Sequence, residues 1–197
     1  MAARIASLAG RFLAEKVGGD DDAASEEIVR AVEGGSDAIV VPAEMLVEEP
    51  LGAPPKPAEA QSLYAQILTM GMAEKIKLAL RGNKDARAIL VRDPAKMIRR
   101  LVLMNPRISD AEVIAVARNR SADEDLLRLI VIRREWMRNY QVRLALATNP
   151  RTPLVIAMRQ LPSLGERDLR AIAKSKHVGA SVAAQARRMI AQMGGPK

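Results

Sequence analysis

Short amphipathic patterns recur along the chain from Ala58 onward, and each predicts a helix of roughly ten residues. The stretches "AEAQSLYAQILTM", "AEKIKLALR" and "KDARAILVR" place apolar residues three and four positions apart, and Gly71 and Gly82-Asn83 separate them. The stretch "LLRLIVI" (126–132) is apolar on nearly all sides, which is typical of a helix with neighbours on every face. The pattern predicts an all-α body of about ten short helices over residues 58–193.

Helix-start signals support this division of the body. A serine followed three residues later by a glutamate is a capping box, in which each side chain satisfies a backbone N–H of the first turn. A capping residue directly before a proline is a second start signal. Capping boxes are predicted at Ser109, Ser121 and Ser163, and cap-plus-proline starts at Asp93-Pro94 and Thr152-Pro153.

The sequence also contains a weak internal repeat. Asn-Pro-Arg occurs in "LVLMNPRIS" and in "LALATNPRTP", with Asn105 and Asn149 separated by 44 residues. Proline disfavours helix in the residue before it, so the motif predicts a turn between helices, in preference to an anion-binding loop. Other positions follow the same offset, namely Ile98, Val142 and Ala186, and Arg99, Arg143 and Arg187. A period in the low forties is typical of armadillo and HEAT repeats.

The body resembles the short-helix α-solenoid superfamily of armadillo, HEAT and leucine-rich-repeat-variant proteins. The stretch "NPRTPLVIAMRQL" resembles the variant repeats, whose units carry Asn-Pro-x-Thr-Pro ahead of a helix. The stretches "REWMRNYQVRLALATNPRTP" and "DLRAIAKSKHV" are similar to a group of uncharacterised bacterial proteins. The resemblance covers residues 70–192. It implies an α-solenoid that presents a binding surface to macromolecules, and it implies no catalytic residue.

The charge differs sharply between the two parts of the chain. Residues 1–57 hold 5 Lys and Arg against 11 Asp and Glu, a net charge of −6, whereas residues 58–197 carry +14. The first part is also rich in Gly and Pro, and such segments bury too little apolar surface to offset their ordering entropy. We therefore expect a largely disordered acidic arm over 1–57, with a short helix at 3–17 and one apolar island, "AIVVPAEML" (38–46), as a transient strand or linear motif.

Composition excludes several chemistries. The chain has no Cys, which excludes disulfides, thiol nucleophiles and zinc–thiolate sites, and its one histidine, His177, argues against a His-based metal site. The acidic run 123–125 falls in the first turn of an expected helix, where acids favour the dipole, so we predict no metal or cofactor there. No apolar run reaches the roughly 18 residues of a membrane span, and no secretory signal is apparent. We expect a cytoplasmic protein.

Basic residues are the main candidates for function. Those at expected helix C-termini, such as Arg118 and Lys174, suit the macrodipole, and His177 is expected to be a surface or capping residue. Mid-helix arginines at repeat-equivalent positions would instead form one basic surface, which we call the arginine ladder; a merely solvated face is the alternative. The arginine ladder comprises Arg99, Arg100, Arg143, Arg187 and Arg188.

Two aromatic residues lie among arginines in "RREWMRNYQVR". Trp136 and Tyr140 are four positions apart, with Arg138 between them. They are either core residues between repeats or contact residues flanked by guanidinium groups.

These features predict a non-enzymatic adaptor that binds an acidic protein surface or peptide through its arginines. The alternative is a nucleic-acid-binding protein that contacts the phosphate backbone through the same face. A solenoid enzyme of the DNA-glycosylase type ranks third, because it would need an aromatic-lined cleft and aromatics make up only 2% of the chain. The acidic arm is a further candidate ligand of the body, or serves only to keep a basic protein in solution.

Overall fold

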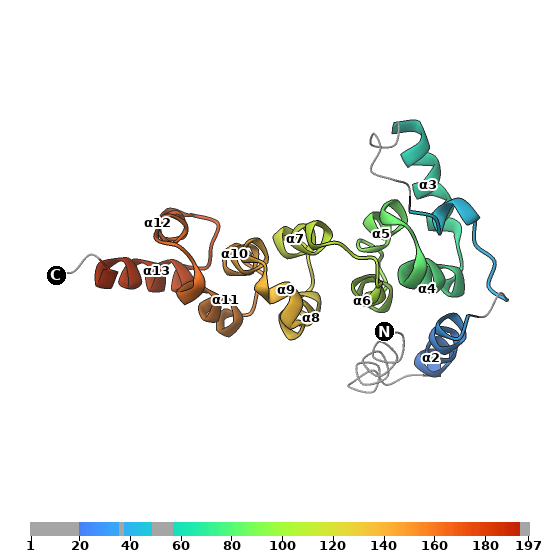
Figure 1. Cartoon of the computed structure of the whole chain (residues 1–197), viewed down its shortest axis with the longest axis horizontal. Helices are drawn as coiled ribbons and strands as arrows, with labels where there is room; N and C mark the ends of the chain where they lie inside the picture. The colour runs from blue at the N-terminus through green and yellow to red at the C-terminus, as the bar shows by residue number, and fades with distance from the viewer. Residues whose placement is uncertain (1–19, 36–37, 49–56, 194–197) are drawn as a thin grey trace. The chain divides into compact units, whose positions relative to one another are not determined.

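A computed structural model of the chain describes residues 20–35, 38–48 and 57–193. This described part contains twelve α-helices, two short 3-10 helices and no strand (Figure 1). The predicted all-α class is therefore confirmed for these residues, with slightly more helices than expected. The helix predicted at 3–17 lies outside them.

The chain divides into two compact units, residues 1–108 and 109–197. The helices of the first unit are α2 (Asp20–Glu33), η1 (Ala43–Met45), α3 (Pro57–Thr69), α4 (Met72–Arg81), α5 (Lys84–Leu90) and α6 (Lys96–Met104). Those of the second are α7 (Asp110–Arg118), α8 (Glu124–Ile132), α9 (Arg134–Arg138), α10 (Tyr140–Thr148), α11 (Leu154–Gln160), η2 (Leu161–Ser163), α12 (Glu166–Lys174) and α13 (Ala180–Met193).

The first unit has α4 at its centre. This helix contacts α2, α5 and α6, and its residues Ile76 and Leu78 are fully buried. The same aliphatic core contains Leu90 of α5 and Leu101 of α6. Aliphatic side chains at helical spacing thus form a continuous core, as the amphipathic pattern predicts.

Part of the predicted acidic arm belongs to this core, while residues 1–19, 36–37 and 49–56 of the arm lie outside the described residues. Val29 and Val32 of α2 are buried, as are Val41 and Met45 of the following segment. Ile28, Ile39 and Leu46 pack against the same core. Burial of these apolar side chains stabilises the segment although its overall composition is acidic. Residues 38–46 form no strand, and their Val41 and Met45 are buried in the core of the first unit.

Of the three predicted capping boxes, the one at Ser109 is confirmed, and the helices after Ser121 and Ser163 begin at other residues. Ser109 caps α7: its Oγ accepts from the Glu112 N–H at 3.4 Å, and its own N–H donates to the Glu112 carboxylate at 2.9 Å. The N-cap of α8 is Asp123, whereas the Ser121 N–H donates to the Asn119 side chain. The N-cap of α12 is Gly165. Turns preceding these helices engage the predicted serines, so the helices begin later.

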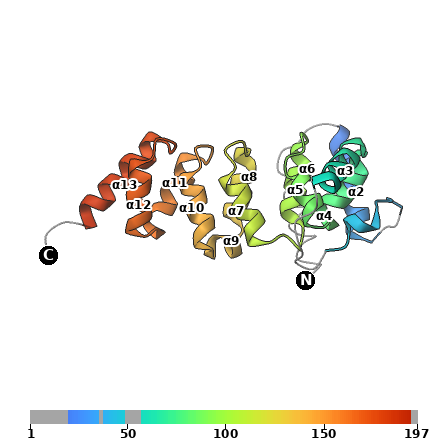
Figure 2. The same ribbon diagram turned by 90° about the horizontal axis from the view of Figure 1, so that it is seen from above.

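In the second unit the helices follow one another in chain order from α7 to α13 (Figure 2). Helix α10 contacts α7, α9 and α11, and α12 contacts α13. Val142 and Ala186, which share the 44-residue offset with Ile98 of the first unit, are fully buried, as is Ile98. The offset found in the sequence therefore marks core positions in three helices.

Each unit contains one buried asparagine that connects two of its helices. Asn105 ends α6, and its Nδ2 donates to the carbonyls of Ala79 and Gly82 at 3.0 and 3.2 Å, at the C-terminus of α4. Asn149 ends α10, and its Nδ2 donates to the carbonyls of Ala117 and Asn119 at 2.7 and 2.9 Å, at the C-terminus of α7. The Asn-Pro motif is thus more than a turn: its amide supplies the hydrogen bonds that the last turn of another helix lacks.

The C-terminus of α6 meets the C-terminus of α4, and the C-terminus of α10 meets that of α7. Because the helices of each pair also pack side by side, they run parallel. At the opposite end of the second pair, Asn139 at the N-cap of α10 donates to Asp110 in the first turn of α7 at 2.9 Å. In both pairs the asparagine Oδ1 also accepts from the backbone N–H two residues later, that of Arg107 or Arg151, at 2.9 Å.

We predict that Asn149→Ala destabilises the protein by about 2–4 kcal/mol, because the carbonyls of Ala117 and Asn119 at the end of α7 and the Arg151 N–H lose their partner. Pro150→Ala should change the free energy of unfolding by less than about 1 kcal/mol, since Pro150 is exposed. Leu146→Asp, which places an unpaired charge at a fully buried site, should be at least as damaging as Asn149→Ala. Denaturant titrations of the three variants test this order; equal costs at Asn149 and Pro150 would contradict it.

A second prediction concerns the arm. Met45→Ala should cost about 2–5 kcal/mol, because the Met45 side chain is 1% exposed in the core of the first unit. Val47→Ala, two residues away at a side chain that is 61% exposed, is the matched control and should be nearly neutral. Thermal melts that show no difference between the two variants would mean that the segment does not contribute to folding.

Candidate functional site

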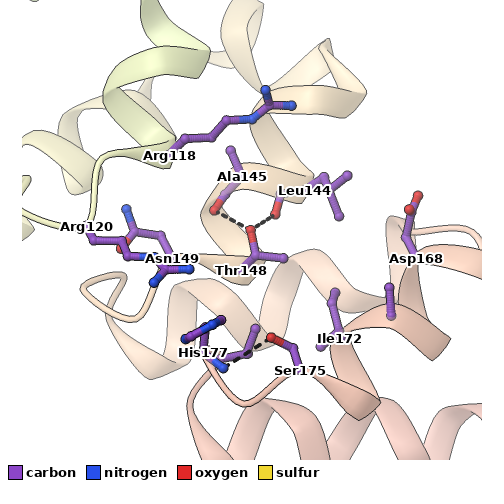
Figure 3. A pocket seen from close by; sticks show the side chains of 12 residues that line it. Arg118, Arg120, Leu144, Ala145, Thr148, Asn149, Asp168, Ile172, Ser175 and His177 are labelled. Carbon is purple, nitrogen blue, oxygen red and sulfur yellow. Dashed lines mark hydrogen bonds between the residues drawn. The ribbon is translucent and has the colours of Figure 1, made fainter.

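The second unit contains a pocket of about 460 Å³ at the C-terminal ends of α7, α10 and α12 (Figure 3). Its wall includes Arg118 and Arg120 from the end of α7, and Thr148 and Asn149 from the end of α10. We call it the basic pocket. It arises from the parallel arrangement, which brings helix ends of one kind together. The other lining residues are Leu144, Ala145, Asp168, Ala171, Ile172, Ser175, His177 and Val178.

Carbonyl groups on the α10 side of the pocket are already satisfied. The Thr148 Oγ1 donates to the Leu144 carbonyl at 2.9 Å and to the Ala145 carbonyl at 3.1 Å (Figure 3). Asn149 caps the end of α7 in the same way. The acceptors of these helix ends are therefore engaged within the protein, and a ligand meets mainly the side chains around them.

Two arginines and a histidine are among the residues that line the pocket. Arg118 extends along its edge, and its Nη2 donates to the Gln141 side chain at 2.8 Å. Arg120 is exposed, and His177 is also exposed, its backbone N–H donating to the Ser175 Oγ at 3.2 Å. Three helix C-termini carry about half a negative charge each. Arg118 and Arg120 lie beside these helix ends, and Asp168 is the acidic residue of the lining.

The acidic residue of the pocket has its own partner. The Tyr140 hydroxyl donates a short hydrogen bond to the Asp168 carboxylate and accepts from the Gly165 N–H at 3.1 Å. This bond to Asp168 raises the pKa of the Tyr140 phenol above its usual value. The Arg143 guanidinium lies over the Tyr140 ring, 5.7 Å from its centroid. Asp168 thus has a hydrogen-bond partner within the protein.

The structure places the predicted contact residues in different environments. Trp136 is 6% exposed, with the Arg133 guanidinium 4.6 Å from its ring centroid, which matches the alternative of a core residue. Burial lowers the pKa of the Arg133 guanidinium, partly offset by Glu135. Tyr140 and Arg143 are brought together beside the pocket, as described above.

The remaining predicted residues differ in exposure and location. Arg138, Arg187 and Arg188 are exposed in the second unit. Arg99 and Arg100 are half-buried on α6 of the first unit, where the Arg99 Nη1 donates to the Asp93 carbonyl at 2.8 Å. That the arginine ladder forms one binding surface stays a prediction.

Sequence reasoning did not bring the basic pocket together. From the sequence, Arg118 is expected to serve its own helix end and His177 to be a surface or capping residue. Each expectation follows from a single helix, whereas in the structure the C-terminal ends of α7 and α12 line the same pocket. The available signal was the Asn-Pro-Arg repeat, because an asparagine that reaches the end of an earlier helix makes the two helices parallel.

Further features limit what the site can be. Among the residues that the structure describes, no group of three or more His, Cys, Asp or Glu side chains is positioned to hold a metal ion. No helix within the described ranges is long and apolar enough to cross a membrane. Comparisons with protein-family models, curated proteins and solved structures find no match for the chain. The resemblance to solenoid families is therefore supported only at the level of an all-helical protein made of short helices.

We predict that Tyr140 ionises above the usual tyrosine value of about 10. Its raised pKa means that the neutral phenol stabilises the fold below that value, and that this stabilisation is lost as the pH rises through the folded-state pKa. The difference in alkaline ultraviolet absorbance between the wild type and Tyr140→Phe isolates this titration. Asp168→Asn should move the midpoint back toward the usual value. A midpoint at or below about 10 in the wild type would rule out the Tyr140–Asp168 bond.

Proposed function

We propose that the chain is a non-enzymatic binding protein, built as a helical-repeat solenoid, that engages an acidic protein surface or peptide. The observation that carries this proposal is the basic pocket, where arginines from the end of α7 meet the ends of α10 and α12 while the one carboxylate is held by Tyr140. Concave sites with a few convergent polar groups are the usual form of ligand sites.

The charge of the second unit supports the proposal. Residues 109–197 hold 16 Lys and Arg against 8 Asp and Glu, a net charge of +8. Two of the arginines, Arg128 and Arg170, form ion pairs one turn away along their own helices, with Glu124 and Glu166. Acids are too few to neutralise the remaining cations, so a field of positive sign surrounds the pocket and favours acidic partners.

The parallel helix pairs support the repeat arrangement. Each unit contains one Asn-Pro-Arg motif whose asparagine caps an earlier helix, and the 44-residue offset marks buried positions. Repeats of this kind present equivalent residues at the same end of successive helix pairs. The exposed arginines Arg138, Arg187 and Arg188 lie outside the pocket lining and are separate candidates for contact with an acidic partner.

Nucleic-acid binding through phosphate contacts is the competing function. A duplex would contact many exposed arginines at once and would depend little on one pocket. An acidic peptide can place single carboxylates in the pocket, where Arg118 and Arg120 would form charge-assisted hydrogen bonds with them. The two functions therefore differ in which arginines contribute most to the affinity: those of the pocket for a peptide, and many exposed arginines for a duplex.

The test uses a labelled glutamate-rich peptide and a generic DNA duplex, each titrated with the full chain at low and physiological salt. Arg118→Ala/Arg120→Ala should weaken peptide binding about tenfold, given up to about 1 kcal/mol for each exposed charge pair. Arg128→Ala/Arg170→Ala removes the same charge from ion-paired positions of the same unit, and should change the affinity much less.

Two results would contradict the proposal. Equal losses in both double variants would show that net charge alone attracts the peptide. Duplex binding that persists at physiological salt, with a slope of about −0.9 in log K per phosphate contacted, would favour the nucleic-acid function if it exceeded peptide binding.

A further inference from the structure

The first unit holds a segment of its own chain at the end of a helix pair. Arg107, two residues after Asn105, donates from its Nη1 to the Leu46 carbonyl at 2.7 Å. Asn83 donates from its Nδ2 to the Glu44 carbonyl at 3.0 Å and from its backbone N–H to the Met45 carbonyl at 2.7 Å. Three successive carbonyls of the arm are therefore bound by residues at the ends of α4 and α6.

Other contacts complete this recognition. Arg81, the last residue of α4, donates from its Nη2 to the Glu33 carbonyl at 3.4 Å. The Lys77 ammonium, on a residue only 7% exposed, donates to the Ile39 carbonyl. Arg87 pairs with the Glu48 carboxylate at 2.5 Å. Cationic and amide donors thus bind main-chain carbonyls and one carboxylate, while Val41 and Met45 are buried as apolar anchors.

The second unit has the same arrangement of residues at the end of its parallel helix pair. Arg118 is the last residue of α7, as Arg81 is the last residue of α4, and each helix is capped by the asparagine of an Asn-Pro-Arg motif. Arg151 follows Asn149 by two residues, as Arg107 follows Asn105, and its N–H makes the same bond to the asparagine Oδ1.

The two ends differ in what covers them. Arg120 lies two residues after the end of α7, as Asn83 does after the end of α4, and it lines the basic pocket. Arg120 and Arg151 are both exposed. Where the first unit binds residues 44–46, the second unit has a pocket of about 460 Å³ bordered by arginines.

We propose that the basic pocket binds the main chain of an extended acidic peptide, in the way that the first unit holds residues 44–48. Arg120 and Arg151, the counterparts of Asn83 and Arg107, donate to successive carbonyls of the ligand. The carboxylates of the ligand lie among the guanidinium groups of Arg118 and Arg120. The ligand is a peptide segment of another protein with acidic residues on either side of an apolar residue. This inference rests on the proposed function and adds that shape and chirality are recognised as well as charge.

The chain supplies its own probe, a labelled peptide with the sequence of residues 38–48, "AIVVPAEMLVE". The all-D peptide of the same sequence is the control, because it has the same charge and composition but places its carbonyls differently. The full chain should bind the L-peptide at least about tenfold more tightly than the D-peptide at physiological salt. Arg120→Ala and Arg151→Ala should each reduce L-peptide affinity by about threefold or more, and Arg128→Ala should leave it unchanged.

The outcomes separate this inference from the proposed function. Equal binding of the L- and D-peptides, together with binding of the glutamate-rich peptide, would show attraction by charge alone and overturn only the inference. L-peptide binding that is insensitive to Arg120 and Arg151 would place the site elsewhere, for example by exchange with the segment of the first unit, and would also overturn it. Absence of binding by both the L-peptide and the glutamate-rich peptide would overturn the proposed function as well.

Discussion

The last turn of a helix leaves carbonyl groups without partners, and the way this chain satisfies them determines much of its structure. Asn105 and Asn149 each end one helix and donate their side-chain amide to the C-terminal carbonyls of an earlier helix, 23–32 residues back. Because the paired helices also pack side by side, this contact between their C-termini means that they run parallel. The turn after each asparagine is set by the same side chain, through its Oδ1.

In a parallel pair the C-terminal ends of both helices, which carry partial negative charge, lie on the same side of the unit. Arginines lie near these ends. Arg81 and Arg118 are the last residues of α4 and α7, and Arg107 and Arg151 follow the capping asparagines. In the first unit these donors bind carbonyls of the acidic arm, whereas in the second Arg118 lines the basic pocket and Arg151 is exposed. The same feature, a parallel helix pair capped by an asparagine, therefore underlies both the folding of the arm and the proposed ligand site.

The sequence predicts much of the fold but little of the site. Helical spacing, the Ser109 capping box and the Asn-Pro turns are local signals, and they correctly indicate an all-α chain of short helices. Folding of residues 20–35 and 38–48 was missed because a few apolar side chains, such as Met45, are diluted by acids in any local count. The basic pocket was missed because the presence of Arg118 and His177 in one lining depends on which helices pair. That pairing involves the distant carbonyls that Asn149 reaches.

The most direct test of acidic-ligand binding at the basic pocket is an NMR titration of the isotope-labelled full chain with the glutamate-rich peptide at physiological salt. The account predicts that the largest amide shifts fall on the segments that line the pocket, 118–120, 148–149 and 175–178. Shifts spread evenly over the basic residues of both units, with no concentration at these segments, would contradict it.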